Sequence, residues 1–139
     1  MRDLYHNVLA AQVLSPVVST TTKTSSAIDL QGFSGLSVVF DLGLSADTLS
    51  NSLYWTLSLE EGNDNSSWTA VSATECNAGV NSITVNTTSS DRQAYAIGYI
   101  GNARYIKALA TPTGSVSSGM PIGIVALKGI SAYRPVVTP

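Results

Sequence analysis

The sequence has very few residues of the kinds that carry out chemistry or cross-link a chain. It contains one cysteine, Cys76, and one histidine, His6, and its 139 residues include only 7 Lys or Arg and 9 Asp or Glu. A single cysteine excludes an internal disulfide framework. A single histidine near the N-terminus leaves a Ser or Cys nucleophile without an obvious base. The sequence therefore predicts a protein that is not an enzyme and that uses no metal or other cofactor.

The distribution of charge and the lengths of the apolar runs exclude two classes of partner. The formal net charge is −2, and the basic residues are spread from Arg2 to Arg134 without the cluster that phosphate binding needs. No apolar run approaches the ~20 residues of a membrane helix. We therefore expect neither a nucleic-acid partner nor a membrane.

Charged residues make up 12% of the chain, about half the usual share. Ser and Thr take their place, which gives a surface with weak self-repulsion that suits permanent packing against neighbours. The same composition also arises where Ser and Thr are simply tolerated in β-structure.

What the sequence does contain is alternation of apolar and polar residues. Leu53, Trp55, Leu57 and Leu59 alternate with polar or smaller neighbours, and this period of two is typical of a strand with one buried face. The segment 62–65 then supplies Gly, Asn and Asp, which tolerate left-handed backbone angles. Together these features predict a β-hairpin.

The same pattern recurs along the whole chain. Expected extended segments are 4–18, 24–30, 35–42, 53–61, 66–72, 80–85, 94–100, 104–110 and 122–128. Short Gly-, Ser- and Asn-rich connections separate them, among them a tight turn at Gly101 and Asn102 that joins segment 94–100 to segment 104–110. Many short strands predict an all-β fold, a single antiparallel β-sandwich of jelly-roll type. We expect an N-terminal arm (1–18), a sandwich body (19–128) and a C-terminal tail (129–139).

The alternation also predicts which side chains form the core. We expect Trp55, Leu57, Phe40, Val38 and Ile124 to be buried together in the sandwich interior.

Two groups of residues deserve a test as ligand sites. Glu60, Glu61 and Asp64 lack the spacing of a calcium loop, so a solvated hairpin tip is the better interpretation. Tyr95 and Tyr99 share one face of a strand and, with Trp68, are the candidates for stacking a sugar. The tyrosines fit the lining of a core or a subunit seam equally well.

The order of the segments resembles that of small virion structural proteins of tailed bacteriophages and gene transfer agents. The matching pieces, in chain order, are LSPVVSTTT, SAIDL, LSVVF, LSLEEGNDNSSWTAV, AYAIGYIGNARYIKALAT and AYRPV. This resemblance covers nearly the whole chain but consists of strands and turns rather than a catalytic signature.

The resemblance implies a noncatalytic protein that decorates or cements the capsid shell, made in the host cytoplasm and located at the capsid surface. The implied partners are the major capsid protein and copies of the chain itself in a homo-oligomer, for example a trimer. Both chain ends suit attachment, because extended segments add to exposed strand edges and because Tyr and Arg are frequent binding anchors. The predicted contact residues are Arg2, Leu4, Tyr5, His6, Tyr133, Arg134 and Pro135. The alternative is a carbohydrate- or receptor-binding module of a head fibre or tail component.

Overall fold

Almost all regular structure in this protein is antiparallel β-strand. The structure is a computed structural model and describes residues 3–132. Its strands are β1 (Val8–Ser19), β2 (Lys23–Thr24), β3 (Ile28–Asp29), β4 (Phe33–Leu42), β5 (Tyr54–Gly62), β6 (Thr69–Ala70), β7 (Ser82–Val85), β8 (Ala94–Tyr99), β9 (Tyr105–Thr113) and β10 (Met120–Ser131). Two short 3-10 helices, η1 (Ala73–Glu75) and η2 (Asn77–Gly79), lie between β6 and β7. The all-β prediction is confirmed.

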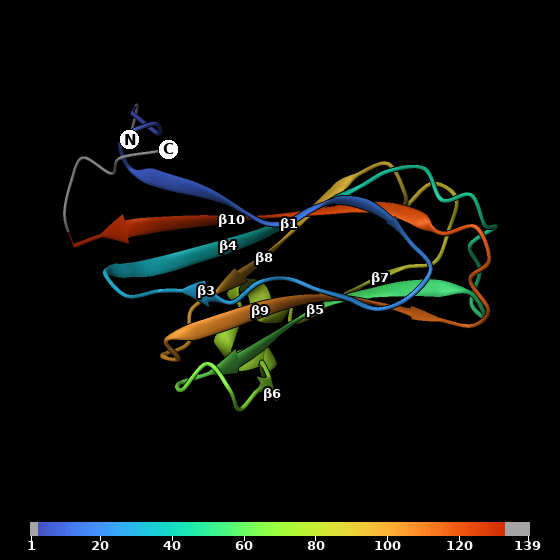
Figure 1. Ribbon diagram of the computed structural model, residues 1–139. Helices are drawn as coiled ribbons and strands as arrows, with labels where there is room; N and C mark the ends of the chain where they lie inside the picture. The colour runs from blue at the N-terminus through green and yellow to red at the C-terminus, as the bar shows by residue number, and fades with distance from the viewer. Residues whose placement is uncertain (1–2, 133–139) are drawn as a thin grey trace.

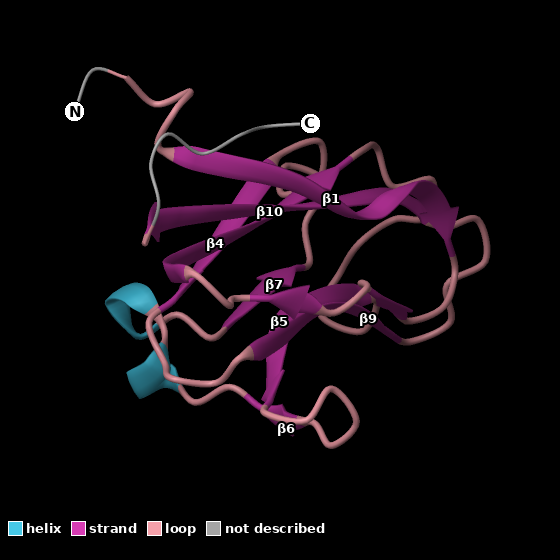
Figure 2. Cartoon of the chain, turned by 60° about the vertical axis from the view of Figure 1, so that its left-hand side comes forward, coloured by secondary structure: helices cyan, strands magenta, loops and turns pink. Residues whose placement is uncertain are grey.

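The strands form two facing sheets, seen from two directions in Figures 1 and 2. The first sheet has the order β1-β10-β4-β8, and the second has the order β2-β9-β5-β6, with β3 also paired to β9 and β7 also paired to β5. When β2 with β3 and β6 with β7 are each counted as one interrupted strand, eight strands remain in two sheets of four. The first strand then pairs with the eighth, the second with the seventh, the third with the sixth and the fourth with the fifth. This is the topology of a jelly roll.

The core lies between the two sheets and is filled by every second residue of each strand. Along β4 and β5 buried and half-buried positions alternate, as the period of two requires. The five residues predicted for the core are all buried, with exposed fractions of 1% for Trp55 and 0% for Leu57, Phe40, Val38 and Ile124. The face assignment made from the sequence is therefore confirmed.

The hairpin tip after β5 has the turn chemistry that its sequence predicted. The Asp64 carboxylate accepts backbone N–H groups from Ser66 at 2.9 Å and from Ser67 at 2.8 Å. Asn65 has a φ of 55°, in the left-handed region that Asn tolerates. Asp64 therefore stabilises the turn, and its pKa is held well below the ordinary value by these hydrogen bonds.

The strands on either side of Gly101 and Asn102 are not neighbours in one sheet, which corrects the expected strand pair. β8 pairs with β4 in the first sheet, whereas β9 pairs with β5 in the second. The connection therefore crosses from one sheet to the other at the end of the sandwich. Alternation predicted correctly that both strands bury one face, but a buried face does not specify the neighbouring strand.

The predicted arm 1–18 also needs correction. Residues 8–19 form β1, which pairs with β10 from Val8 opposite Gly129 to Ser19 opposite Met120. The register shifts on both sides of Leu14, and Pro16 falls within the second shift, where an edge strand tolerates a proline. Only residues before β1 are left for an arm. At the other end β10 continues to Ser131, three residues into the segment predicted as a tail.

Candidate partner-binding surface

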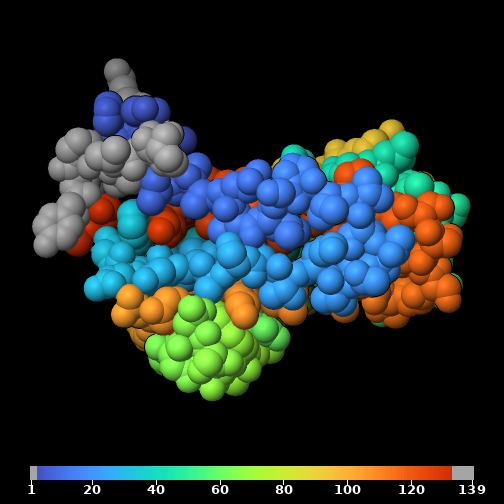
Figure 3. All heavy atoms as spheres, viewed as in Figure 1, coloured from blue at the N-terminus to red at the C-terminus, as the bar shows by residue number. Residues whose placement is uncertain are grey.

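The residues before β1 form an ordered turn. The Leu4 carbonyl oxygen accepts the backbone N–H groups of Asn7 and Val8, both at 3.1 Å. The Asp3 carboxylate caps the same turn by accepting the His6 backbone N–H at 3.1 Å. The first described residues are thus held close to the start of β1, at the end of the molecule where the dark-blue atoms project in Figure 3.

This turn presents an apolar and aromatic group to solvent. Leu4 is 66% exposed and Tyr5 is 68% exposed. The Tyr5 and His6 rings meet edge to face with centroids 5.0 Å apart, and His6 Nδ1 lies 2.6 Å from Asp3 Oδ2. The His6 backbone N–H, followed by the His6 ring, lowers the pKa of the Asp3 carboxyl. The turn therefore holds three of the predicted contact residues, Leu4, Tyr5 and His6, and all three are exposed.

The other predicted contact residues lie outside the part of the chain that the structure describes. These are Arg2, Tyr133, Arg134 and Pro135.

Beside the turn, the outer face of the first sheet carries an apolar groove of about 280 Å³. Its lining comes from the turn and from three strands of that sheet, namely Leu4, Val8, Gly35, Leu36, Ser37, Leu127 and Gly129. Sequence analysis missed most of these residues, because a strand pattern does not reveal that β1, β4 and β10 lie side by side.

The groove continues into a sheet face with almost no charge. Because Val38, Ala126 and Ile97 point into the core, their neighbours along each strand point outward. The outward residues of the central rows are Ala10, Gln12, Ser37, Val39, Ala96, Val125 and Leu127, whereas the outer side of Gly98 is covered by the Asn77 side chain. An outer face of this composition is well suited to packing against another protein surface.

The tyrosines considered for sugar stacking face the core instead. Tyr99 is 2% exposed, and Tyr95 is half-buried with its hydroxyl donating to the Ser90 carbonyl at 2.6 Å. Trp68 is half-buried, and the Lys107 Nζ lies 4.1 Å from its ring centroid. The prediction that Tyr95 and Tyr99 form an exposed stacking platform is therefore wrong, because the two-residue period of β8 turns both side chains toward the interior.

Two of the three acidic residues of the hairpin, Glu61 and Asp64, have hydrogen-bond partners in the protein. Glu61 accepts the Tyr99 hydroxyl, and Asp64 accepts two backbone N–H groups. Between residues 3 and 132, no three His, Cys, Asp or Glu side chains are grouped closely enough to hold a metal ion. Over the same residues, no helix has the length and apolar character that crossing a bilayer requires.

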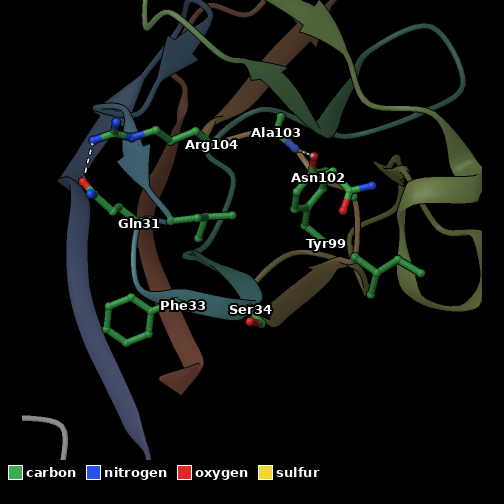
Figure 4. Close-up of a pocket in the computed structure, with 10 residues that line it drawn as sticks. Gln31, Phe33, Ser34, Tyr99, Asn102, Ala103 and Arg104 are labelled. Carbon is green, nitrogen blue, oxygen red and sulfur yellow. Dashed lines mark hydrogen bonds between the residues drawn. The ribbon is translucent and has the colours of Figure 1, made fainter. Parts of the chain in front are cut away.

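A second concave region lies at the end of the sandwich, between the β3–β4 turn and the β8–β9 connection (Figure 4). It has a volume of about 420 Å³. Its lining residues are Leu30, Gln31, Phe33, Ser34, Tyr99, Ile100, Gly101, Asn102, Ala103 and Arg104. The sequence did not reveal this pocket, because Gly101 and Asn102 suggested a hairpin rather than a crossing between sheets.

One side of this end pocket is fixed by an ion pair. Arg104 donates from Nε and Nη2 to the two Asp29 carboxylate oxygens, at 3.1 and 2.9 Å. The Arg104 Nη2 also donates to Gln31 Oε1 at 2.7 Å. The hydrogen bonds from Arg104 lower the pKa of Asp29, and Asp29 in turn raises the pKa of Arg104. Both groups therefore stay charged, and they neutralise one another.

Comparison with known proteins shows a shared fold. No family model and no curated protein sequence matches the chain. The PBSX exported protein XepA matches with a TM-score of 0.54 and 13% identity over 94% of this chain and 40% of that chain. The SPBc2 prophage-derived protein YomS gives 0.38 at 13% identity, covering 88% and 92% of the two chains. A module from Clostridium stercorarium in complex with cellobiose gives 0.34 at 12% identity, covering 90% and 83%.

Only the first of these scores exceeds 0.5, so the conclusion rests on XepA and concerns the fold alone. The chain spans 40% of the length of XepA.

Proposed function

We propose that this chain is a noncatalytic structural protein of a tailed-phage virion, which decorates or cements the capsid shell. Its partners are the major capsid protein and further copies of itself. The resemblance of its segment order to small virion proteins supports this, as does a jelly-roll fold shared with an exported protein of PBSX. The segment order and the shared fold support a structural role in a virion. Attachment to the capsid shell is argued from the surface of this chain.

The observation that carries the proposal is the outer face of the first sheet, whose central rows are uncharged and on which Asp41 lies near the end of β4. Cores of lasting interfaces are depleted in charged residues and are more apolar than the remaining surface. Val39, Val125 and Leu127 lie on this face and are half-buried, with Ala and Gly beside them. Small side chains on a sheet allow a partner to approach closely over a wide area.

The N-terminal turn supplies an anchor next to that face. Leu4 and Tyr5 are exposed apolar side chains on a backbone that is already hydrogen-bonded. An ordered segment loses less conformational entropy on binding than a free one. Leu4 also lines the groove, so the turn and the sheet face form one continuous surface.

The surroundings of the reactive groups support the noncatalytic part of the proposal. The His6 ring contacts Asp3 and Tyr5 rather than a hydroxyl or thiol nucleophile. Cys76 is buried, and burial raises the pKa of its thiol, which makes it a poor nucleophile.

The test is co-sedimentation of the purified chain with undecorated capsids. Val39→Lys places a charge in the middle of the outer face and should lower binding at least tenfold, because a buried unpaired charge costs a large part of an interface's free energy. Thr56→Lys is the matched control, since Thr56 faces outward from a central strand of the second sheet and is also half-buried. Circular dichroism reports whether both variants fold.

If the Val39→Lys protein folds and binds capsids as tightly as the unaltered chain, the outer face of the first sheet is not the capsid-binding surface. Binding of the unaltered chain to no capsid at all would refute the cement function itself.

A further inference from the structure

The pocket at the end of the sandwich combines free hydrogen-bonding groups with apolar side chains. The Gln31 Nε2, the Ser34 hydroxyl and the Asn102 side-chain amide line it, and none has a hydrogen-bond partner among residues 3–132. Between them these groups offer both donors and acceptors. Exposed amides and hydroxyls that line one hollow are suited to a ligand that carries several hydroxyl groups.

The apolar part of the same pocket is formed by Leu30, Phe33 and Ile100. Ile100 is 57% exposed although it is a large aliphatic side chain. In Figure 4 the Phe33 ring and Ser34 lie on one side of the pocket and Asn102 lies across from them. The lining is more polar than apolar, which suits a ligand with several hydroxyl groups, and about 420 Å³ lies within the usual range of small-molecule sites.

The charge of the site disfavours an anion. Within residues 3–132, Arg104 is the only charged residue of the lining, and Asp29 occupies two of its donors in bidentate geometry. A phosphate or carboxylate would have to compete with Asp29 for the guanidinium edge that such groups prefer. The Lys128 Nζ lies nearby, 4.8 Å from the Phe33 ring centroid, but it does not line the pocket. A neutral ligand can bind without breaking the ion pair between Arg104 and Asp29.

The walls are also held in place before any ligand arrives. The Leu30 backbone N–H donates to the Arg104 carbonyl at 2.9 Å, which ties the β3–β4 turn to the start of β9. The Tyr99 hydroxyl accepts the Ala103 backbone N–H at 2.9 Å and fixes the β8–β9 connection. Preorganised walls lower the entropy cost of binding.

We propose that this pocket binds a neutral saccharide unit. The apolar C–H face of the sugar packs on Phe33 and Ile100, while its hydroxyl groups hydrogen-bond to Gln31, Ser34 and Asn102. This inference does not depend on capsid attachment, because it concerns the end of the sandwich rather than the outer face of the first sheet.

The experiment is a ¹H–¹⁵N NMR titration of the full chain with three neutral disaccharides: cellobiose, maltose and diacetylchitobiose. Glucuronate and inorganic phosphate serve as charged probes. We expect at least one neutral disaccharide to cause saturable shifts in the amides of residues 30–34 and 100–104, with a dissociation constant in the millimolar range. Asn102→Ala should weaken that binding at least fivefold. The Asn102 side chain has no hydrogen-bond partner in the part of the chain that the structure describes, so its loss should leave the fold intact.

The control is Asn51→Ala, an exposed asparagine at the opposite end of the sandwich whose side-chain oxygen accepts a hydrogen bond from Asn86 at 3.0 Å; it should leave the titration unchanged. Three results would overturn the proposal: no shift at the pocket with any of the neutral sugars, shifts there with glucuronate or phosphate alone, or sugar binding that Asn102→Ala does not weaken.

Discussion

The Tyr99 hydroxyl donates a hydrogen bond to the Glu61 carboxylate and thereby joins the two sheets of the sandwich. Tyr99 belongs to β8 in the first sheet, and Glu61 belongs to β5 in the second. The same hydroxyl accepts the Ala103 backbone N–H at 2.9 Å. Burial, followed by the bond to Glu61, raises the pKa of Tyr99 well above its ordinary value, so the hydroxyl remains a donor at any physiological pH.

Tyr99→Phe is expected to lower the free energy of unfolding by about 1–3 kcal/mol, because it leaves the Ala103 N–H and the Glu61 carboxylate without this partner. Urea unfolding measures the change. Tyr105→Phe is the control and should alter stability by less than about 0.5 kcal/mol, since the Tyr105 ring interacts with Arg104 through its face and keeps that contact in Phe. Equal effects of the two substitutions would contradict a specific role for the Tyr99 hydroxyl.

Trp55→Ala should lower the free energy of unfolding by about 3–5 kcal/mol, because it leaves a cavity in the centre of the core. Trp55 is 1% exposed. The comparison is Leu44→Ala, which truncates an exposed apolar residue and should cost little. An unchanged unfolding midpoint in Trp55→Ala would mean that the inner face of β5 is assigned wrongly.

Asp47 is expected to make stability depend on pH. Its carboxylate accepts the Ser117 hydroxyl at 2.7 Å and the Gly119 backbone N–H at 2.7 Å, and these hydrogen bonds lower its pKa below the ordinary value of 3.8. A group whose pKa is lowered by folding stabilises the native state above its unfolded pKa. That contribution is lost as the pH falls through the folded pKa, because the native state must then be protonated.

Asp47→Asn should therefore lower the melting temperature at neutral pH by a few degrees, a shift on the scale that the loss of one interaction produces in a domain of this size. The melting temperatures of Asp47→Asn and of the unaltered chain should converge as the pH falls below about 4. Thermal denaturation followed by circular dichroism across this pH range tests both statements. A constant difference at every pH would rule out the Asp47 charge as the cause.

The assignment of β1 to the body predicts different outcomes for two N-terminal truncations. Removal of residues 1–6 leaves β1 in place and should preserve the fold. Removal of residues 1–18 takes away almost all of β1 and uncovers one edge of β10, so this protein should unfold or aggregate. Size-exclusion chromatography and circular dichroism distinguish the two, and a monomeric, cooperatively folded 1–18 deletion would contradict the role of β1.

Treatment with EDTA should leave the melting temperature unchanged, since residues 3–132 contain no group of ligands suited to a metal ion. Differential scanning fluorimetry with and without the chelator, followed by excess calcium, is sufficient. A loss of several degrees that calcium restores would show that a cation contributes to the fold.

The sequence by itself determined which residues are extended and which of their faces are buried. Alternation around Trp55 and Phe40 identified the core, and Asp64 with Asn65 identified a turn, because side-chain periodicity and left-handed backbone angles are local properties. The shortage of histidine, cysteine and charge likewise limited the chemistry available to the chain.

Only the tertiary structure decided which strands are neighbours. Backbone hydrogen bonds between strands are the same for any sequence, so alternation did not distinguish β4 from β9 as the partner of β8, nor a free arm from an edge strand at β1. Both concave regions depend on which strands are neighbours and on where the chain crosses between the sheets. The groove needs β1, β4 and β10 side by side, and the end pocket exists because the chain crosses between sheets at Gly101 and Asn102. These surfaces are formed by residues far apart in the sequence, and their proximity arises only when the two sheets pack.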